Sequence, residues 1–176
     1  MIRVRIATLD DIALISALAT RTFRETFVED FAMPYTTSDL ATHERESYGV
    51  DAISGYLREP EYRHFIAEGD DADDVRGRAL GYALAGPNGL PHADHCDGDG
   101  ELKRIYVVRE AQGTGAGRAL FDAALEWLGD RRVWLGVWSG NLRAQRFYER
   151  RAFVKVGEYD FRVGETLDRE FILRRG

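Results

Sequence analysis

A cluster of three glycines within five positions is the feature that most constrains how this chain folds. The segment reads Gln112-Gly113-Thr114-Gly115-Ala116-Gly117-Arg118. It follows a strand-like run, residues 102–108, and opens a helical run, residues 115–129. Glycines let the backbone adopt positive φ and approach a ligand closely, and the first amide groups of a helix are unpaired and partly positive. We therefore predict a phosphate- or pyrophosphate-binding turn, with a purely structural strand-to-helix turn as the alternative.

Two common phosphate-binding motifs do not match this turn. A P-loop needs Gly-x-x-x-x-Gly-Lys followed by Ser or Thr, and the sequence has no such string. A dinucleotide fold needs Gly-x-Gly-x-x-Gly and an acidic residue at the end of the next strand. Here Arg118 replaces the last glycine, and the next strand-like run, residues 133–138, ends without an acid.

The rest of the chain alternates strand and helix patterns over a single domain, residues 1–176. Strands are predicted at residues 2–6, 63–67, 79–85, 102–108, 133–138, 153–162 and 167–174, and helices at residues 8–28, 36–47, 50–58, 115–129 and 141–151. The central strand–helix–strand unit implies a parallel pair, whereas both ends read as antiparallel hairpins. An acidic run, residues 68–74, suits a hairpin turn. The predicted fold class is α/β (α+β): a mixed, mostly antiparallel sheet of about six to seven strands with helices on both faces.

Composition limits the partners of this chain. The net charge is −6, so a nucleic-acid partner, which requires concentrated positive charge, is not expected. No run approaches the ~18 apolar residues that span a bilayer. The alternating start Met1-Ile2-Arg3-Val4-Arg5-Ile6 lacks the apolar core of a signal peptide, so we expect a cytoplasmic protein without a membrane partner.

No metal site is expected. Cys96 is the single cysteine, which excludes an intrachain disulfide and a cysteine-based metal cluster. The surrounding group His92, Asp94, His95, Cys96 and Asp97 matches no zinc spacing and lies in a Gly/Asp-rich loop.

Two motifs resemble those of the GNAT superfamily of N-acetyltransferases. The string Glu101-Leu102-Lys103-Arg104-Ile105-Tyr106-Val107-Val108, followed after four positions by Gln112-x-x-Gly115-x-Gly117, resembles its motif A. The string Asn141-x-x-Ala144-x-x-Phe147-Tyr148-x-x-x-Ala152-Phe153 resembles its motif B, and the spacing between the motifs is that of the family. Ala152 stands where the family usually has glycine, which suggests a different helix cap or a small strain.

The resemblance implies an enzyme that passes the acetyl group of acetyl-CoA directly to an amine, with no metal. It implies cofactor contacts from Ile105, Tyr106, Val107, Val108, Gln112, Gly113, Thr114, Gly115, Ala116, Gly117, Arg118, Asn141 and Tyr148. Backbone amides near Val107 and Val108 would bind the thioester carbonyl or the pantetheine arm.

The resemblance also suggests catalytic residues. Tyr148 would be the general acid that protonates the leaving thiolate, because an ordinary tyrosine carries its proton at neutral pH. Its alternative role is an aromatic on the buried face of its helix. Glu101 would be the general base, with an exposed glutamate at a strand end as the alternative.

The acceptor is left open by the sequence. The segments Phe23–Phe27 and Leu90–His92 resemble a bacterial subgroup that includes polyamine acetyltransferases, which favours a small cationic amine. An amino acid, an aminoglycoside and a protein N-terminus are the other candidates. We expect the loop 87–100 to border the acceptor pocket and the protein to be a monomer or homodimer.

Two other functions compete with an acetyltransferase. A non-catalytic acetyl-CoA-binding module that regulates a partner would need the glycine turn but not Tyr148, so the presence of both favours the enzyme. An acyl-CoA thioesterase would need a positioned water and base that the sequence does not identify.

Overall fold

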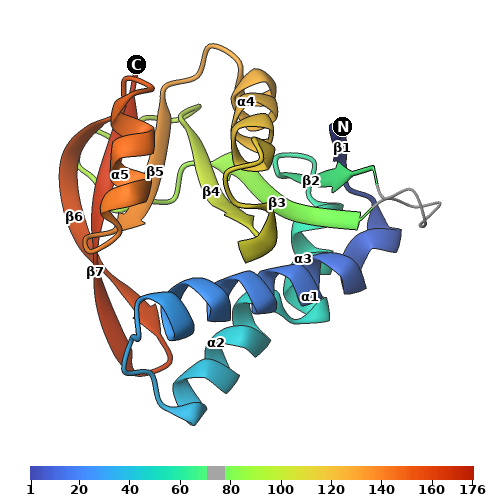
Figure 1. Ribbon diagram of the computed structural model, residues 1–176. Coiled ribbons are helices and arrows are strands. Elements are labelled where there is room, and N and C mark those ends of the chain that lie inside the picture. Colours follow the sequence, from blue (N-terminus) through green and yellow to red (C-terminus); the bar gives the residue numbers. More distant parts are fainter. Residues whose placement is uncertain (71–77) are drawn as a thin grey trace.

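Seven strands form one sheet in the order β1-β2-β3-β4-β5-β7-β6 in the computed structural model, which describes residues 1–70 and 78–176 (Figure 1). The strands are β1 (Ile2–Ile6), β2 (Arg63–Gly69), β3 (Arg78–Pro87), β4 (Gly100–Val107), β5 (Val133–Trp138), β6 (Val154–Val163) and β7 (Thr166–Arg175). All neighbours are antiparallel except β4 and β5. The mixed, mostly antiparallel sheet is confirmed. The expected turn at residues 68–74 lies largely outside the described residues.

Five α-helices connect these strands. They are α1 (Ile12–Phe23), α2 (Thr37–Tyr48), α3 (Val50–Arg58), α4 (Ala116–Leu128) and α5 (Leu142–Glu149). Within the described part of the chain, no helix has the length and apolar character needed to cross a bilayer.

Helices cover both faces of the sheet, as predicted (Figure 1). Side chains alternate along a strand, so Phe65 and Ala67 of β2 face α4, whereas Ile66 between them faces α1. On the α4 face, α5 joins the same apolar cluster through Tyr148, which packs near Phe121 of α4. The two larger hydrophobic clusters of the described residues, one on each face, therefore hold the sheet between two helical layers.

The parallel pair of strands forms a fork. β4 and β5 pair only at Gly100 with Val133 and at Glu101 with Trp134, after which the two strands diverge (Figure 1). β5 instead pairs with β7 along its whole length. The edge of β4 that faces β5 is thus without a strand partner beyond Glu101, which leaves room for a ligand between the strands.

The first helical region is longer and less regular than the predicted helix 8–28. It begins with a 3₁₀ turn, Leu9–Asp11, in which the Asp11 carboxylate accepts a hydrogen bond from the Thr8 amide at 2.8 Å. It ends in a π-helical segment, Arg24–Asp30, of the kind that often occurs at functional sites. This segment reaches the fork between β4 and β5.

The end of α5 confirms the strain expected at Ala152. Ala152 has φ of 63°, in the left-handed region that favours glycine. The Phe153 amide donates to the Tyr148 carbonyl at 3.2 Å, which closes the helix end around this residue. The chain keeps the glycine geometry of the motif with an alanine.

Candidate active site

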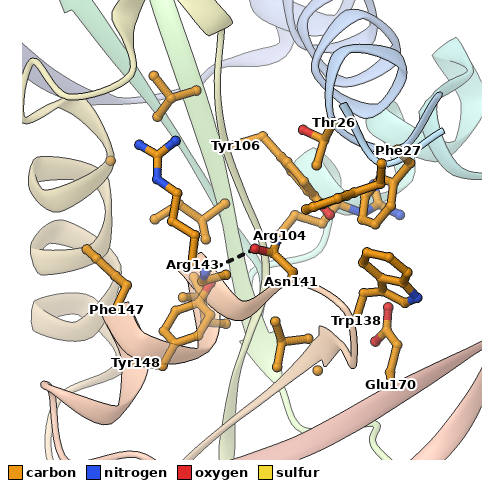
Figure 2. A pocket seen from close by; sticks show the side chains of 18 of the residues that line it. Thr26, Phe27, Arg104, Tyr106, Trp138, Asn141, Arg143, Phe147, Tyr148 and Glu170 are labelled. Carbon is orange, nitrogen blue, oxygen red and sulfur yellow. Dashed lines mark hydrogen bonds between the residues drawn. The ribbon is translucent and has the colours of Figure 1, made fainter. Parts of the chain in front are cut away.

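A cavity of about 380 Å³ occupies the fork between β4 and β5. Its walls come from β4, β5, α5 and the π-helical segment, together with Glu170 of β7. Figure 2 shows Trp138 and Glu170 on one side of this larger cavity and Phe147 and Tyr148 on the other. Its lining is mixed, with aromatic rings beside a few polar groups, as is usual for small-molecule sites.

The glycine turn combines positive φ angles with amides that have no carbonyl partner in the described part of the chain. Gly113 and Gly115 have φ of 82° and 99°, and a Cβ added to Gly113 would meet open space. Among residues 1–70 and 78–176, no carbonyl accepts a hydrogen bond from the amides of Gly115, Gly117 or Arg118. These free amides open α4, where the helix dipole adds partial positive charge.

The structure places the predicted cofactor residues in three ways. Ile105, Tyr106, Val107, Gln112, Gly117, Asn141 and Tyr148 line the larger cavity. Gly113, Thr114, Gly115, Ala116 and Arg118 form the turn after Gln112 and the first residues of α4, next to the cavity-lining Gln112 and Gly117. Val108 does not contribute: it is fully buried, and its amide donates to the Leu80 carbonyl at 2.9 Å. The expectation for the Val108 amide is therefore wrong, because that donor is already used within the sheet.

Tyr148 packs in the core and also lines the larger cavity. Its ring packs in the core against Phe121 and Phe153, with centroid distances of 6.2 and 5.9 Å. Its hydroxyl has no hydrogen-bond partner among the described residues, and the residue lines the larger cavity. Burial raises the Tyr148 pKa, and the nearby Glu170 carboxylate raises it further. Tyr148 therefore holds its proton at neutral pH beside the cavity.

Asn141 has a structural role in addition to its place on the cavity wall. Its Oδ1 accepts a hydrogen bond from the Ala144 amide at 3.0 Å and caps the start of α5. The cap fixes the direction of α5 and so the position of Tyr148, two turns further along.

Glu101 lies away from the larger cavity. It is buried, and its Oε2 accepts hydrogen bonds from the Gly89 amide and from the Lys103 Nζ, each at 2.8 Å. This ion-paired carboxylate holds the start of the 88–99 loop against β4. It lines only a second, smaller cavity.

The smaller cavity, of about 220 Å³, adjoins the larger one. Eight aromatic residues line it: Phe23, Phe27, Tyr35, Tyr48, Tyr56, Tyr106, Tyr159 and Phe161. Its carboxylates are Glu101, Asp168 and Glu170. Arg104 lies over the rings of Tyr48 and Tyr56 and donates to the Ser47 carbonyl at 2.9 Å.

Glu170 was not identified from the sequence. The Tyr159 hydroxyl donates to its Oε2 at 2.6 Å, and burial raises the Glu170 pKa to about 7. Along β7, Asp168, Glu170 and Ile172 lie on one face of the strand. Two acidic residues on the same face of a buried strand are the sequence signal that could have identified Glu170.

The 88–99 loop does not border either cavity, contrary to expectation. His92 Nε2 lies 3.1 Å from the Val156 carbonyl, and Asp99 accepts a hydrogen bond from Trp134 Nε1 at 2.8 Å. These contacts hold the loop against β5 and β6, and the carboxylates of the smaller cavity come mainly from β7 instead. Among the described residues, no group of three or more His, Cys, Asp or Glu side chains could hold a metal ion.

Comparison with known proteins identifies the family of this arrangement. A sequence profile of the Acetyltransferase (GNAT) family matches residues 21–153. The chain is 28% identical over 165 residues to an uncharacterised N-acetyltransferase from the pepI 3′ region of Lactobacillus delbrueckii subsp. lactis, covering 86% of each chain. It is 28% identical over 98 residues to a spermine/spermidine N(1)-acetyltransferase of Bacillus subtilis, covering 53% of this chain and 64% of that one.

A solved structure shares the fold. The crystal structure of the PaiA N-acetyltransferase from Thermoplasma acidophilum, in complex with coenzyme A, superposes with a TM-score of 0.73 at 16% identity. The match covers 99% of this chain and 98% of that one.

Proposed function

This chain belongs to the Acetyltransferase (GNAT) family and is an acetyl-CoA-dependent N-acetyltransferase, and we propose that its acceptor is a small cationic amine of the polyamine class. The observation that carries the proposal is the junction of two cavities. One lies in the β4–β5 fork beside the glycine turn, and the other is lined by aromatic rings and carboxylates.

The residues of the fork fit acetyl-CoA. The free amides of Gly115, Gly117 and Arg118 would hold the pyrophosphate, since the turn offers unpaired donors and open space at Gly113. The unpartnered edge of β4 would hold the pantetheine arm through the backbone of Ile105, Tyr106 and Val107.

The smaller cavity suits a positively charged amine. Its two cationic side chains are already engaged, Lys103 with Glu101 and Arg104 with the Ser47 carbonyl and two tyrosine rings. The carboxylates of Asp168 and Glu170 accept hydrogen bonds only from the neutral hydroxyls of Tyr35 and Tyr159 among the described residues. Their charge and the faces of the aromatic rings are therefore left to attract an ammonium group. The similarity to the spermine/spermidine acetyltransferase of Bacillus subtilis supports a polyamine in particular.

Tyr148 is the general acid of this proposal. Acetyl-CoA supplies an acetyl thioester whose C–S bond breaks as the amine nitrogen forms the new C–N bond. The Tyr148 hydroxyl gives its proton to the departing sulfur, and the ammonium proton of the acceptor passes to a base. A primary ammonium with a pKa near ~10.4 is mostly protonated at neutral pH, so this base is required.

A panel of amines tests the proposed acceptor class. Release of free thiol from acetyl-CoA would be measured with spermidine, spermine, amino acids, aminoglycosides and a peptide with a free N-terminus. We expect amine-dependent release with the polyamines and a product whose mass corresponds to one added acetyl group. Acetylation of the other amines alone would refute the polyamine assignment, and no amine-dependent release would refute the proposed reaction.

A further inference from the structure

Glu170 occupies the point at which the two cavities meet. Among the carboxylates that the structure describes, it alone lines both cavities; Asp30 lines the larger one, and Glu101 and Asp168 line the smaller one. A group at this junction can contact an amine in the smaller cavity as that amine reaches toward the fork.

The geometry around Glu170 is fixed by its neighbours. Tyr159 on β6 donates to Oε2 at 2.6 Å. A Cβ added to Gly136 of β5 would lie 2.6 Å from this same oxygen and 2.8 Å from the Tyr159 hydroxyl. Glycine at position 136 therefore makes room for the pair. Within the described residues, Oε1 has no hydrogen-bond donor, so it is free to accept a proton from a ligand.

Burial and the neighbouring carboxylates bring the pKa of Glu170 near neutral pH. Burial has the largest effect and raises the pKa to about 7, while the charges of Asp168 and Glu101 raise it and the Tyr159 hydrogen bond lowers it. The other titratable groups that face the two cavities are, among the described residues, Lys103, Arg104 and Tyr106 on β4, His43 and Tyr48 on α2, Arg143 and Tyr148 on α5, Tyr35, Tyr56 and Asp30. General bases work best when their pKa lies near the operating pH.

Glu101 is less suited to the same task. Its Oε2 already accepts two hydrogen bonds, one of them from the Lys103 ammonium. It also lines only the smaller cavity, at the paired end of the fork, whereas Tyr148 lines the larger cavity.

We infer that Glu170 is the catalytic base of the acetyl transfer, an inference that rests on the proposed function. Oε1 of the carboxylate takes one proton from the acceptor ammonium. The nitrogen lone pair that this frees forms the C–N bond, the electrons of the C–S bond leave with sulfur, and the Tyr148 proton neutralises the thiolate. The nitrogen, positively charged once the C–N bond has formed, then gives its second proton to the Tyr148 oxygen, which leaves a neutral amide. Tyr159 positions the carboxylate through its hydroxyl.

Glu170→Gln tests the inference with little change in shape. The kcat/KM for spermidine would be measured against pH for the wild type, for Glu170→Gln and for Glu101→Gln, with Glu158→Gln, exposed on β6, as the control. We expect Glu170→Gln to lower kcat/KM by about 10²- to 10⁴-fold and to remove the acidic limb of the profile. Glu101→Gln should keep that limb. A Glu170→Gln enzyme with wild-type kcat/KM and the same limb would overturn the inference, as would loss of the limb in Glu101→Gln alone.

Thermal stability gives a readout that is independent of turnover. A carboxyl whose folded-state pKa is raised binds its proton more tightly when folded, so its stabilising contribution is lost as the pH rises from about 4.5 to about 7. The Glu170→Gln variant has no carboxyl at this position and does not lose this stability as the pH rises. The Tm of the variant minus the Tm of the wild type should therefore increase from pH 5 to pH 8. A constant difference would show that Glu170 is not poised to exchange a proton and would overturn the inference. If the wild type acetylates no amine and the Tm difference still increases, the proposed function fails while the proton-binding behaviour of Glu170 stands.

Discussion

Arg143 donates a hydrogen bond from Nη1 to Gln112 Oε1 at 2.7 Å, which joins the start of α5 to the turn before α4. Both residues line the larger cavity. Gln112 belongs to the first sequence motif and Arg143 to the second, so two motifs that are separate in the chain form one continuous wall. The position of Tyr148 on α5 is thereby tied to the turn proposed to hold pyrophosphate.

Gly115→Val is expected to weaken CoA binding. The branched side chain would occupy the open space above the turn, and φ of 99° is unfavourable for valine. Loss of one or more hydrogen bonds to a charged phosphate, each contributing about 1.5–3 kcal/mol, would raise the Kd by about 10- to 100-fold or more. Calorimetric titration with CoA measures this change.

Gly98→Val is the matched control for that experiment. Gly98 has φ of 92° and open space around it, but it lies in the loop that borders neither cavity. It should carry a similar backbone strain and keep wild-type CoA affinity. Unchanged affinity in folded Gly115→Val protein would remove the glycine turn from the cofactor site.

Tyr148→Phe should lower kcat by about 10²- to 10⁴-fold with little change in CoA affinity. The ring, which packs against Phe121 and Phe153, is kept, and only the unpartnered hydroxyl is lost. The decrease should appear equally in kcat and kcat/KM, because the proton is needed only as the C–S bond breaks. Tyr62→Phe, outside both cavities, is the control. Wild-type kcat in Tyr148→Phe would mean that the thiolate leaves unaided and that Tyr148 acts only in packing.

The KM for a polyamine should rise with ionic strength. The acceptor would be attracted by the carboxylates of Asp168 and Glu170, and salt screens such attraction over a Debye length of about 8 Å at 0.15 M. Steady-state kinetics at saturating acetyl-CoA, in low and high salt, measure the effect. A KM that stays constant would argue for a neutral acceptor.

Ala152→Gly should stabilise the protein. The left-handed conformation costs an L-residue roughly 1–2 kcal/mol, and glycine avoids most of this cost while losing some backbone entropy. We expect a net gain of about 0.5–1 kcal/mol and a Tm higher by about 1–4 °C. Ala119→Gly, inside α4, should lower the Tm instead. A lower Tm for Ala152→Gly would show that the alanine methyl makes a compensating contact.

The sequence predicted the parts of this protein that depend on local patterns. The order of strands and helices follows from periodicity, and the turn before α4 follows from three glycines between a strand and a helix. The strain at Ala152 was also predictable, because a motif that usually has glycine fixes the backbone there.

The acceptor side depends on contacts that are distant in the chain and was not predicted. Glu170 meets Tyr159 across a hairpin and lies over Gly136, and none of these three residues belongs to a motif. The 88–99 loop looked functional because of its histidines and acids, yet their partners on β5 and β6 make it structural. Side-chain pairing across a sheet depends on register, which composition alone does not reveal.

A crystal structure of the protein with CoA and a polyamine tests the central claim most directly. The account predicts that the pantetheine arm lies in the fork between β4 and β5 and that the amine occupies the smaller cavity. The reacting nitrogen should lie within hydrogen-bond distance of Glu170, about 2.6–3.2 Å, on the side that faces Tyr148. An amine bound outside the smaller cavity, or a reacting nitrogen that contacts Glu101 and not Glu170, would contradict it.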